Sequence, residues 1–171
     1  YSPTPMGREY VLPFSAALLG ALILFALAIG LAVSAQRVPV AVAAPQLGFE
    51  VLLLLALAWI PLALARRRER FIQTATALVA AAIAFNLLAV PVVLGVGELP
   101  KDPRALTTLQ VVLGWLSLAL LAWKLVVSGH VLRHALDVPL RIGVLIAAAF
   151  LAAEVVLNLA LFGAQGTPAT P

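Results

Sequence analysis

Residues 71–96 read FIQTATALVAAAIAFNLLAVPVVLGV, a run without a single charged side chain. A helix needs about 20 mostly apolar residues to cross the hydrocarbon core of a bilayer, and this run exceeds that length. A soluble domain would have to bury such a helix on every side. The run therefore predicts a transmembrane helix.

Further apolar runs flank this one on both sides, at residues 11–35, 48–65, 106–128 and 142–162. The gaps between them are too short to hold a folded domain. We therefore predict an all-α integral membrane protein, in which residues 1–171 form a single transmembrane domain, a bundle of about five transmembrane helices. Residues 38–44 are also apolar, so a four-span alternative places the first helix in the membrane interface. Pro39 and Pro45 are expected to bracket the first connection.

The composition agrees with a membrane protein and excludes several other classes. Of the 171 residues, 64% are hydrophobic and 11% are charged, against about 25% charged in soluble domains. The absence of cysteine excludes disulfides, iron–sulfur clusters and thiolate metal sites. The net charge of +4 comes without a basic and aromatic platform, so we expect no nucleic-acid partner.

The distribution of Lys and Arg among the short connections predicts the orientation. One side carries Arg66, Arg67, Arg68, Arg70, Arg133 and Arg141, and the other carries Arg37, Lys101 and Arg104. The side with more basic residues is expected to be cytoplasmic. This places the N-terminus inside and the C-terminus outside. The richness in Ala, Leu, Val and Arg is typical of a GC-rich bacterium, which makes the inner membrane the expected location.

Glu154, Asn158 and Asn86 are the polar side chains that hydrocarbon should reject most clearly. An ionised acid at the centre of a span costs about 2.5–3.5 kcal/mol, so Glu154 must face other helices. Asn158 follows on the same helix face. Glu154 is expected about 18 Å and Asn86 about 22 Å from the cytoplasmic ends of their helices, close enough for a hydrogen bond. Lys124, only about 6–8 Å deep, is expected to extend to the headgroups.

This buried polar cluster has two interpretations. It could form a proton or ion relay or a contact for a translocated substrate. Alternatively, its hydrogen bonds could fix how three helices pack, at around 1 kcal/mol each. We favour the second interpretation, because a transport path usually needs more than one carboxylate and two amides.

His130, Arg133 and His134 lie where the fourth run ends. Two histidines four residues apart can share a metal ion, but Val131 stands where the HExxH pattern requires Glu. Both imidazoles on one helix cannot be the two axial ligands of one haem. We therefore expect no metal and no cofactor, and interpret the two histidines as an interfacial pair of hydrogen-bonding side chains. A pH-sensitive contact with lipid headgroups or a partner is favoured over metal binding. The cluster Arg66–Arg70 is read as a topology signal or as a patch for anionic lipids or an acidic partner.

Pairs of small residues four apart predict places where helices approach closely. They are Gly30 with Ser34, Ala80 with Ala84, and Gly143 with Ala147.

Several patterns together resemble the Yip1-like family of small five-span membrane proteins. They are Gly114-Trp115 through Trp123 to Gly129-His130, the segment Arg70-Phe71-Ile72-Gln73-Thr74, and the segment Arg133-His134-Ala135-Leu136. The resemblance covers most of residues 47–162. Residues 2–10 lack the long polar region and the aromatic Gly-Pro motif of eukaryotic relatives. The resemblance implies a non-enzymatic membrane protein that interacts with other proteins.

From these observations we predict a non-catalytic inner-membrane protein that serves as an accessory subunit or scaffold of a larger complex. Its expected partners are membrane lipids and other membrane subunits or further copies of itself. A transporter or channel component using Glu154, Asn158 and Asn86 is the alternative. A haem or quinone anchor at His130 or His134 is a weaker one.

Overall fold

The computed structural model describes residues 16–34, 39–97, 100, 102 and 105–162. Five long apolar helices account for nearly all of them, which confirms the predicted all-α transmembrane architecture. The helices are α1 (Ala16–Ser34), α2 (Val40–Leu64), α3 (Phe71–Val96), α4 (Thr108–Leu136) and α5 (Leu140–Phe162), with a short 3-10 helix η1 (Arg68–Arg70) before α3. Each of the five is long and apolar enough to cross a membrane.

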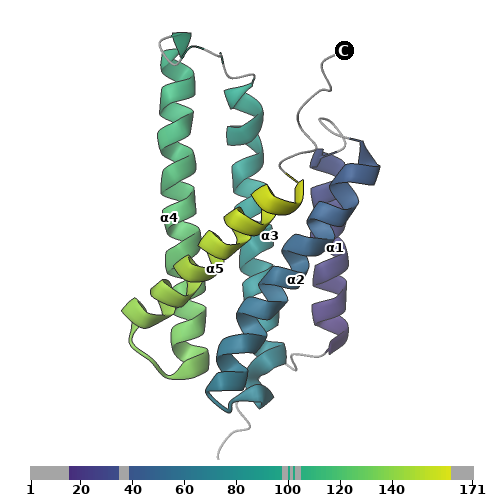
Figure 1. Cartoon of the computed structure of the whole chain (residues 1–171), viewed down its shortest axis with the longest axis vertical. Coiled ribbons are helices and arrows are strands. Elements are labelled where there is room, and N and C mark those ends of the chain that lie inside the picture. The colour runs from purple at the N-terminus through teal and green to yellow at the C-terminus, as the bar shows by residue number, and fades with distance from the viewer. Residues whose placement is uncertain (1–15, 35–38, 98–99, 101, 103–104, 163–171) are drawn as a thin grey trace, which may run out of the picture.

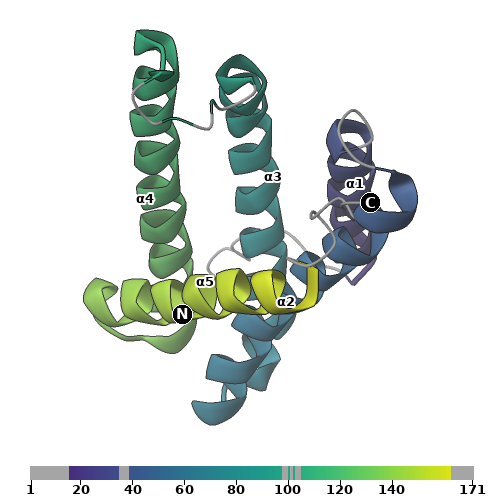
Figure 2. The ribbon, with the colours of Figure 1, turned by 45° about the horizontal axis from the view of Figure 1, so that its top comes forward.

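The helices form two unequal groups around α3. Figure 1 shows α3 and α4 as an upright antiparallel pair, with α1 and α2 packed on the other side of α3. Helix α5 starts beside the end of α4 and runs obliquely across the molecule until it reaches α2. Figure 2 shows the same crossing from a second direction. Because α5 is inclined, it brings α4 and α2 into one packed unit.

Two predicted boundaries were wrong. Helix α2 begins at Val40, not near Gly48, and Pro45 lies inside the helix instead of in the connection. A proline near the start of a helix removes only one backbone hydrogen bond, so the helix continues through it. Helix α4 continues to Leu136, well beyond Ser128. The start of the first predicted run, residues 11–15, and residue 35 lie outside the described residues.

The buried core is concentrated toward one end of the helices. Its most buried large side chains are Leu62, Leu78, Val79 and Leu132, from the end of α2, the first half of α3 and the end of α4. This is also the end where the arginines gather, and we call it the basic end, defined by Arg66, Arg67, Arg68, Arg70, Arg133 and Arg141. By contrast, no residue of α4 before Ser128 is buried.

Helices α4 and α5 make their closest contact through two glycines. A Cβ atom on Gly143 would overlap the carbonyl oxygen of Gly129, and one on Gly129 would lie 2.8 Å from the backbone nitrogen of Val144. The small pair Gly143 and Ala147 is buried, as predicted. For Ala80 with Ala84 the prediction was wrong, because both residues are exposed.

Candidate functional site

Four helices each place one polar side chain on a single small pocket. The residues are Glu50 from α2, Asn86 from α3, Lys124 from α4 and Glu154 from α5. The pocket has a volume of about 110 Å³, and alkyl and aromatic side chains form the rest of its wall. We call these four residues the central charge cluster. Their position near the middle of four apolar helices is the most unusual chemical feature of the chain.

The four residues lie at similar distances from the basic end. Counted along each helix at about 1.5 Å per residue, they are about 18–23 Å from the helix ends at Leu64, Phe71, Leu136 and Leu140. The four residues therefore occupy similar positions along their helices, and one pocket collects them.

Lys124 occupies a different environment from the one predicted. It was expected to extend to the headgroups because the fourth span was taken to end at Ser128. The helix continues for two more turns to Leu136, which moves Lys124 toward the centre. Its ammonium lies 5.2 Å from the centroid of the Phe85 ring and on the same pocket as Glu154. Lys124 and Glu154 therefore line one pocket, which the predicted end of the fourth span did not suggest.

Glu50 lies within electrostatic reach of both Glu154 and Lys124. With every group ionised, the two carboxylates and one ammonium would leave one unbalanced negative charge. Charges interact far more strongly in a low-dielectric interior than in water, so that imbalance is costly. The pocket therefore brings two acidic side chains and one basic side chain together.

Asn158 forms a second link between α5 and α2. Its Oδ1 accepts a hydrogen bond of 3.2 Å from Nε2 of Gln46. Gln46 precedes Glu50 by four residues on α2, and Glu154 precedes Asn158 by four residues on α5. The Gln46–Asn158 pair therefore lies about one helical turn from Glu50 and Glu154. Asn86 and Glu154 share the pocket, but within the described residues no hydrogen bond joins them. The predicted Asn86–Glu154 bond was therefore wrong.

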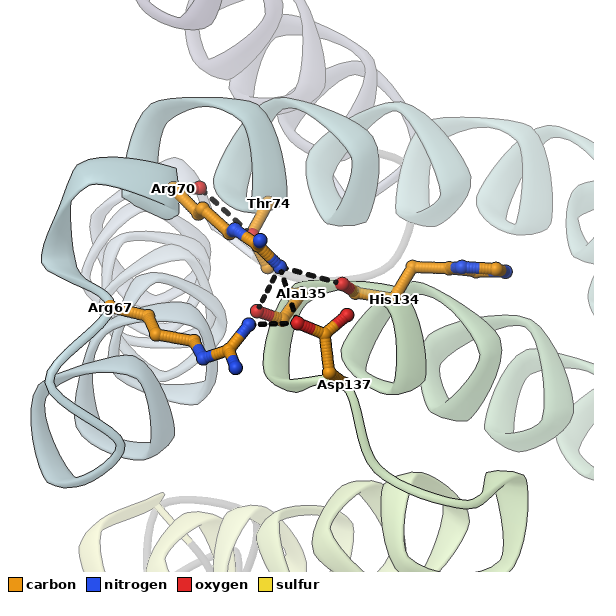
Figure 3. A network of polar contacts seen from close by, with 6 residues as sticks. All are labelled: Arg67, Arg70, Thr74, His134, Ala135 and Asp137. Atoms are coloured by element: carbon orange, nitrogen blue, oxygen red, sulfur yellow. Dashed lines mark hydrogen bonds and ion pairs between the residues drawn. The ribbon is translucent and has the colours of Figure 1, made fainter.

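A separate polar network closes the basic end (Figure 3). Arg67 donates to the Asp137 carboxylate, and Nη1 of Arg70 donates to the same oxygen at 3.3 Å. Arg70 also donates to the carbonyls of His134 at 3.1 Å and Ala135 at 3.2 Å. The hydrogen bond from Arg67 lowers the pKa of Asp137 below its ordinary value, and the charges of both arginines act in the same direction. The network ties the α2–α3 connection to the end of α4.

The remaining predicted residues at the basic end lie on its surface. The Nε2 atoms of His130 and His134 are 3.1 Å apart, and Arg133 and Arg66 are exposed. The guanidinium of Arg68 lies 5.7 Å from the Trp59 ring centroid.

Sequence reasoning missed Glu50 and Gln46. With the second span starting at residue 48, Glu50 counted as a boundary residue and Gln46 as part of a loop. The signal that could have found them is the apolar run from Val40 to Ala44, which extends the helix by two turns toward its N-terminus.

The chain is a multi-pass integral membrane protein. It matches no protein-family model, no curated protein and no solved structure. Its function must therefore be argued from its own residues.

Proposed function

We propose that the protein is a proton-linked transport component whose central charge cluster binds and releases one proton. The observation that supports this is the convergence of Glu50, Glu154 and Lys124 on one pocket. Ionisable residues within membrane helices mark proton and substrate pathways more often than they serve packing alone. The sequence alone indicated one carboxylate and two amides, too few for a transport path. The central charge cluster holds two carboxyl groups, one amino group and one amide.

The charge balance supports a cycle of one proton. In the proposed cycle, Lys124 balances the charge of one carboxylate and a bound proton balances the other. Loss of that proton leaves the pocket with a net negative charge, which favours uptake of a proton from the opposite side.

The donor set favours a proton over a metal ion. Hard divalent cations such as Ca²⁺ take about six to eight oxygen ligands, and Glu50, Glu154 and Asn86 together offer fewer. The nearby ammonium of Lys124 would also repel a cation. A proton needs only one carboxylate oxygen.

Proton flux into liposomes tests this proposal. The purified protein is reconstituted with a trapped pH-sensitive dye, and a potassium diffusion potential drives protons inward. We expect flux with the wild-type chain and loss of flux with Glu154→Gln and with Glu50→Gln, because neither amide can carry the proton.

Glu69→Gln is the matched control, because Glu69 is an exposed carboxylate at the basic end, remote from the pocket. It should keep full flux. Wild-type flux equal to that of empty liposomes, or unchanged flux in both cluster variants, would reject the proposal. Size-exclusion profiles of all variants verify that they are folded.

A second candidate is an accessory subunit or scaffold of the bacterial inner membrane without catalysis of its own. It is supported by α4, whose residues 108–127 bury no side chain within the chain and leave Trp115 70% exposed. The resemblance to the Yip1-like family supports the same role. Gentle extraction of the native protein followed by mass spectrometry tests it, since a subunit would carry a stoichiometric partner and an independent transporter would not.

A further inference from the structure

A second, larger pocket lies between the start of α3 and the end of α4. Its volume is about 510 Å³, within the range of about 300–1,000 Å³ typical of small-molecule sites. Its polar lining consists of Arg70, Gln73, Thr74, His130 and His134, and its apolar lining of Ala77, Val131 and Ala135. The central charge cluster contributes no residue to it.

The polar lining offers hydrogen-bond donors and positive charge. Arg70 supplies a permanent cation and Gln73 an amide group. The imidazoles of His130 and His134, whose Nε2 atoms are 3.1 Å apart, add ring nitrogens beyond the one N–H that their mutual contact uses. No carboxylate lines the pocket. This chemistry selects an anion, and guanidinium groups are especially suited to phosphate oxygens.

Arg70 is held in position by contacts that occupy only one of its three nitrogens. Among the described residues, Nη1 makes all the hydrogen bonds recorded for this side chain, to the carbonyls of His134 and Ala135 and to Asp137. In the described part of the chain, Nε and Nη2 of Arg70 make no hydrogen bond. Figure 3 shows the His134 side chain directed away from the Arg67–Asp137 pair.

The position of the pocket indicates where its anion comes from. It lies at the first turns of α3 and the last turns of α4, where these apolar helices begin and end. On α3 the apolar residue Ala77 lies one turn further toward the membrane centre than Thr74, and on α4 Val131 lies between the two histidines while Ala135 follows His134. A ligand with a phosphate group and an attached acyl chain matches this combination.

We propose that this pocket binds the phosphate group of an anionic phospholipid at the membrane surface. The general attraction of basic residues for anionic lipids would not distinguish one arginine from another. A built site would. Arg70 and the histidine pair should matter, whereas the basic residues outside the pocket should not.

Native mass spectrometry of the full chain from nanodiscs tests this distinction. The nanodiscs contain phosphatidylcholine with or without phosphatidylglycerol, and the retained lipid is counted. We expect one phosphatidylglycerol per wild-type chain and about fivefold weaker retention in Arg70→Gln. His130→Ala combined with His134→Ala should weaken retention similarly. The histidine variant is needed because Arg70 also holds the α4 end, so its loss could disturb folding.

Arg68→Gln and Arg141→Gln are matched controls, because both residues are basic, exposed and absent from the pocket lining. Both should retain the lipid. Equal loss in the pocket and control variants would overturn the proposal in favour of nonspecific attraction. Inorganic phosphate is then added to the same samples. If it displaces phosphatidylglycerol at low millimolar concentration, the site takes a free anion and the lipid assignment is wrong.

Discussion

Asp137 makes the basic end sensitive to acid. It accepts hydrogen bonds from Arg67 and Arg70, and the bond from Arg67 is the main reason that its pKa is lowered below 3.8 in the folded protein. A carboxyl group whose pKa falls on folding contributes stability above its unfolded pKa, and the contribution disappears as the pH falls through the folded value. We therefore expect wild-type thermal stability in detergent to fall below about pH 4.

Asp137→Asn provides the comparison, since Asn also tolerates the left-handed backbone at this position, where φ is 55°. The variant should be less stable than wild type at neutral pH, and the difference should shrink under acid. A difference that stays constant between pH 7 and pH 3 would contradict the assignment of the pKa shift to this contact.

Gln46 and Asn158 should behave as an energetically coupled pair. Replacing either one with Leu leaves the other amide without its partner in an apolar environment. The double variant Gln46→Leu with Asn158→Leu should then lose less stability than the sum of the single variants, with a coupling of about 0.6–1 kcal/mol. Thermal unfolding in one detergent measures all four proteins. Strict additivity would show that the bond contributes nothing.

The polar residues differ in how well the sequence predicts them. Glu154 and Asn158 were found because they stand alone in an apolar run, where any charge or amide is conspicuous. Glu50 was missed and Lys124 was placed too near the headgroups, because each lies close to a boundary that hydropathy placed wrongly. Depth in the membrane is a property of the whole helix, so an error of two turns at one end changes the interpretation of a residue in the middle.

At the level of helices, the contact between α4 and α5 depends on the absence of side chains at Gly129 and Gly143. We expect Gly143→Ala to destabilise the protein by about 1–3 kcal/mol, because the new methyl group overlaps the Gly129 carbonyl and the helix backbones must separate. The melting temperature in detergent measures this loss.

Gly114→Ala is the control on α4 itself, because no atom lies within 4 Å of the position of its new Cβ. Alanine is the better helix former, so this variant should be as stable as wild type or more stable by up to about 1 kcal/mol. Equal melting temperatures for Gly143→Ala and wild type would show that the two helices separate at little cost.

Hydropathy predicted the number of helices correctly but not all of their ends. The bounds of α3 agree with the prediction because charged residues precede Phe71 and a glycine follows Val96. The start of α2 and the end of α4 were missed because prolines and polar residues there do not end the helices. Helix packing was predicted only in part. The sequence of a small-residue pair such as Ala80 with Ala84 does not show whether another helix covers that face.

Across the whole molecule, packing and charge are concentrated at the same end. The buried core and the Arg67–Asp137 network both lie toward the basic end, where they join the α2–α3 connection to the end of α4. The opposite half of α4 contributes no buried side chain. Any partner subunit is therefore expected to contact α4 in that half, and cross-linking from Trp115 or its neighbours would find it there.

The basic end also provides a test of orientation that leaves the fold intact. We expect a C-terminal alkaline phosphatase fusion to be active and a C-terminal fluorescent protein fusion to be dark, because the basic connections favour the cytoplasm.

Arg66 and Arg68 contribute to this bias without taking part in the Arg67–Asp137 pair. Arg66→Gln with Arg68→Gln should therefore lower the ratio of phosphatase activity to fluorescence while the purified variant keeps its melting temperature. Strong fluorescence from the wild-type fusion would reverse the orientation and place the basic end outside. The pocket proposed to bind the phospholipid phosphate would then face the other leaflet.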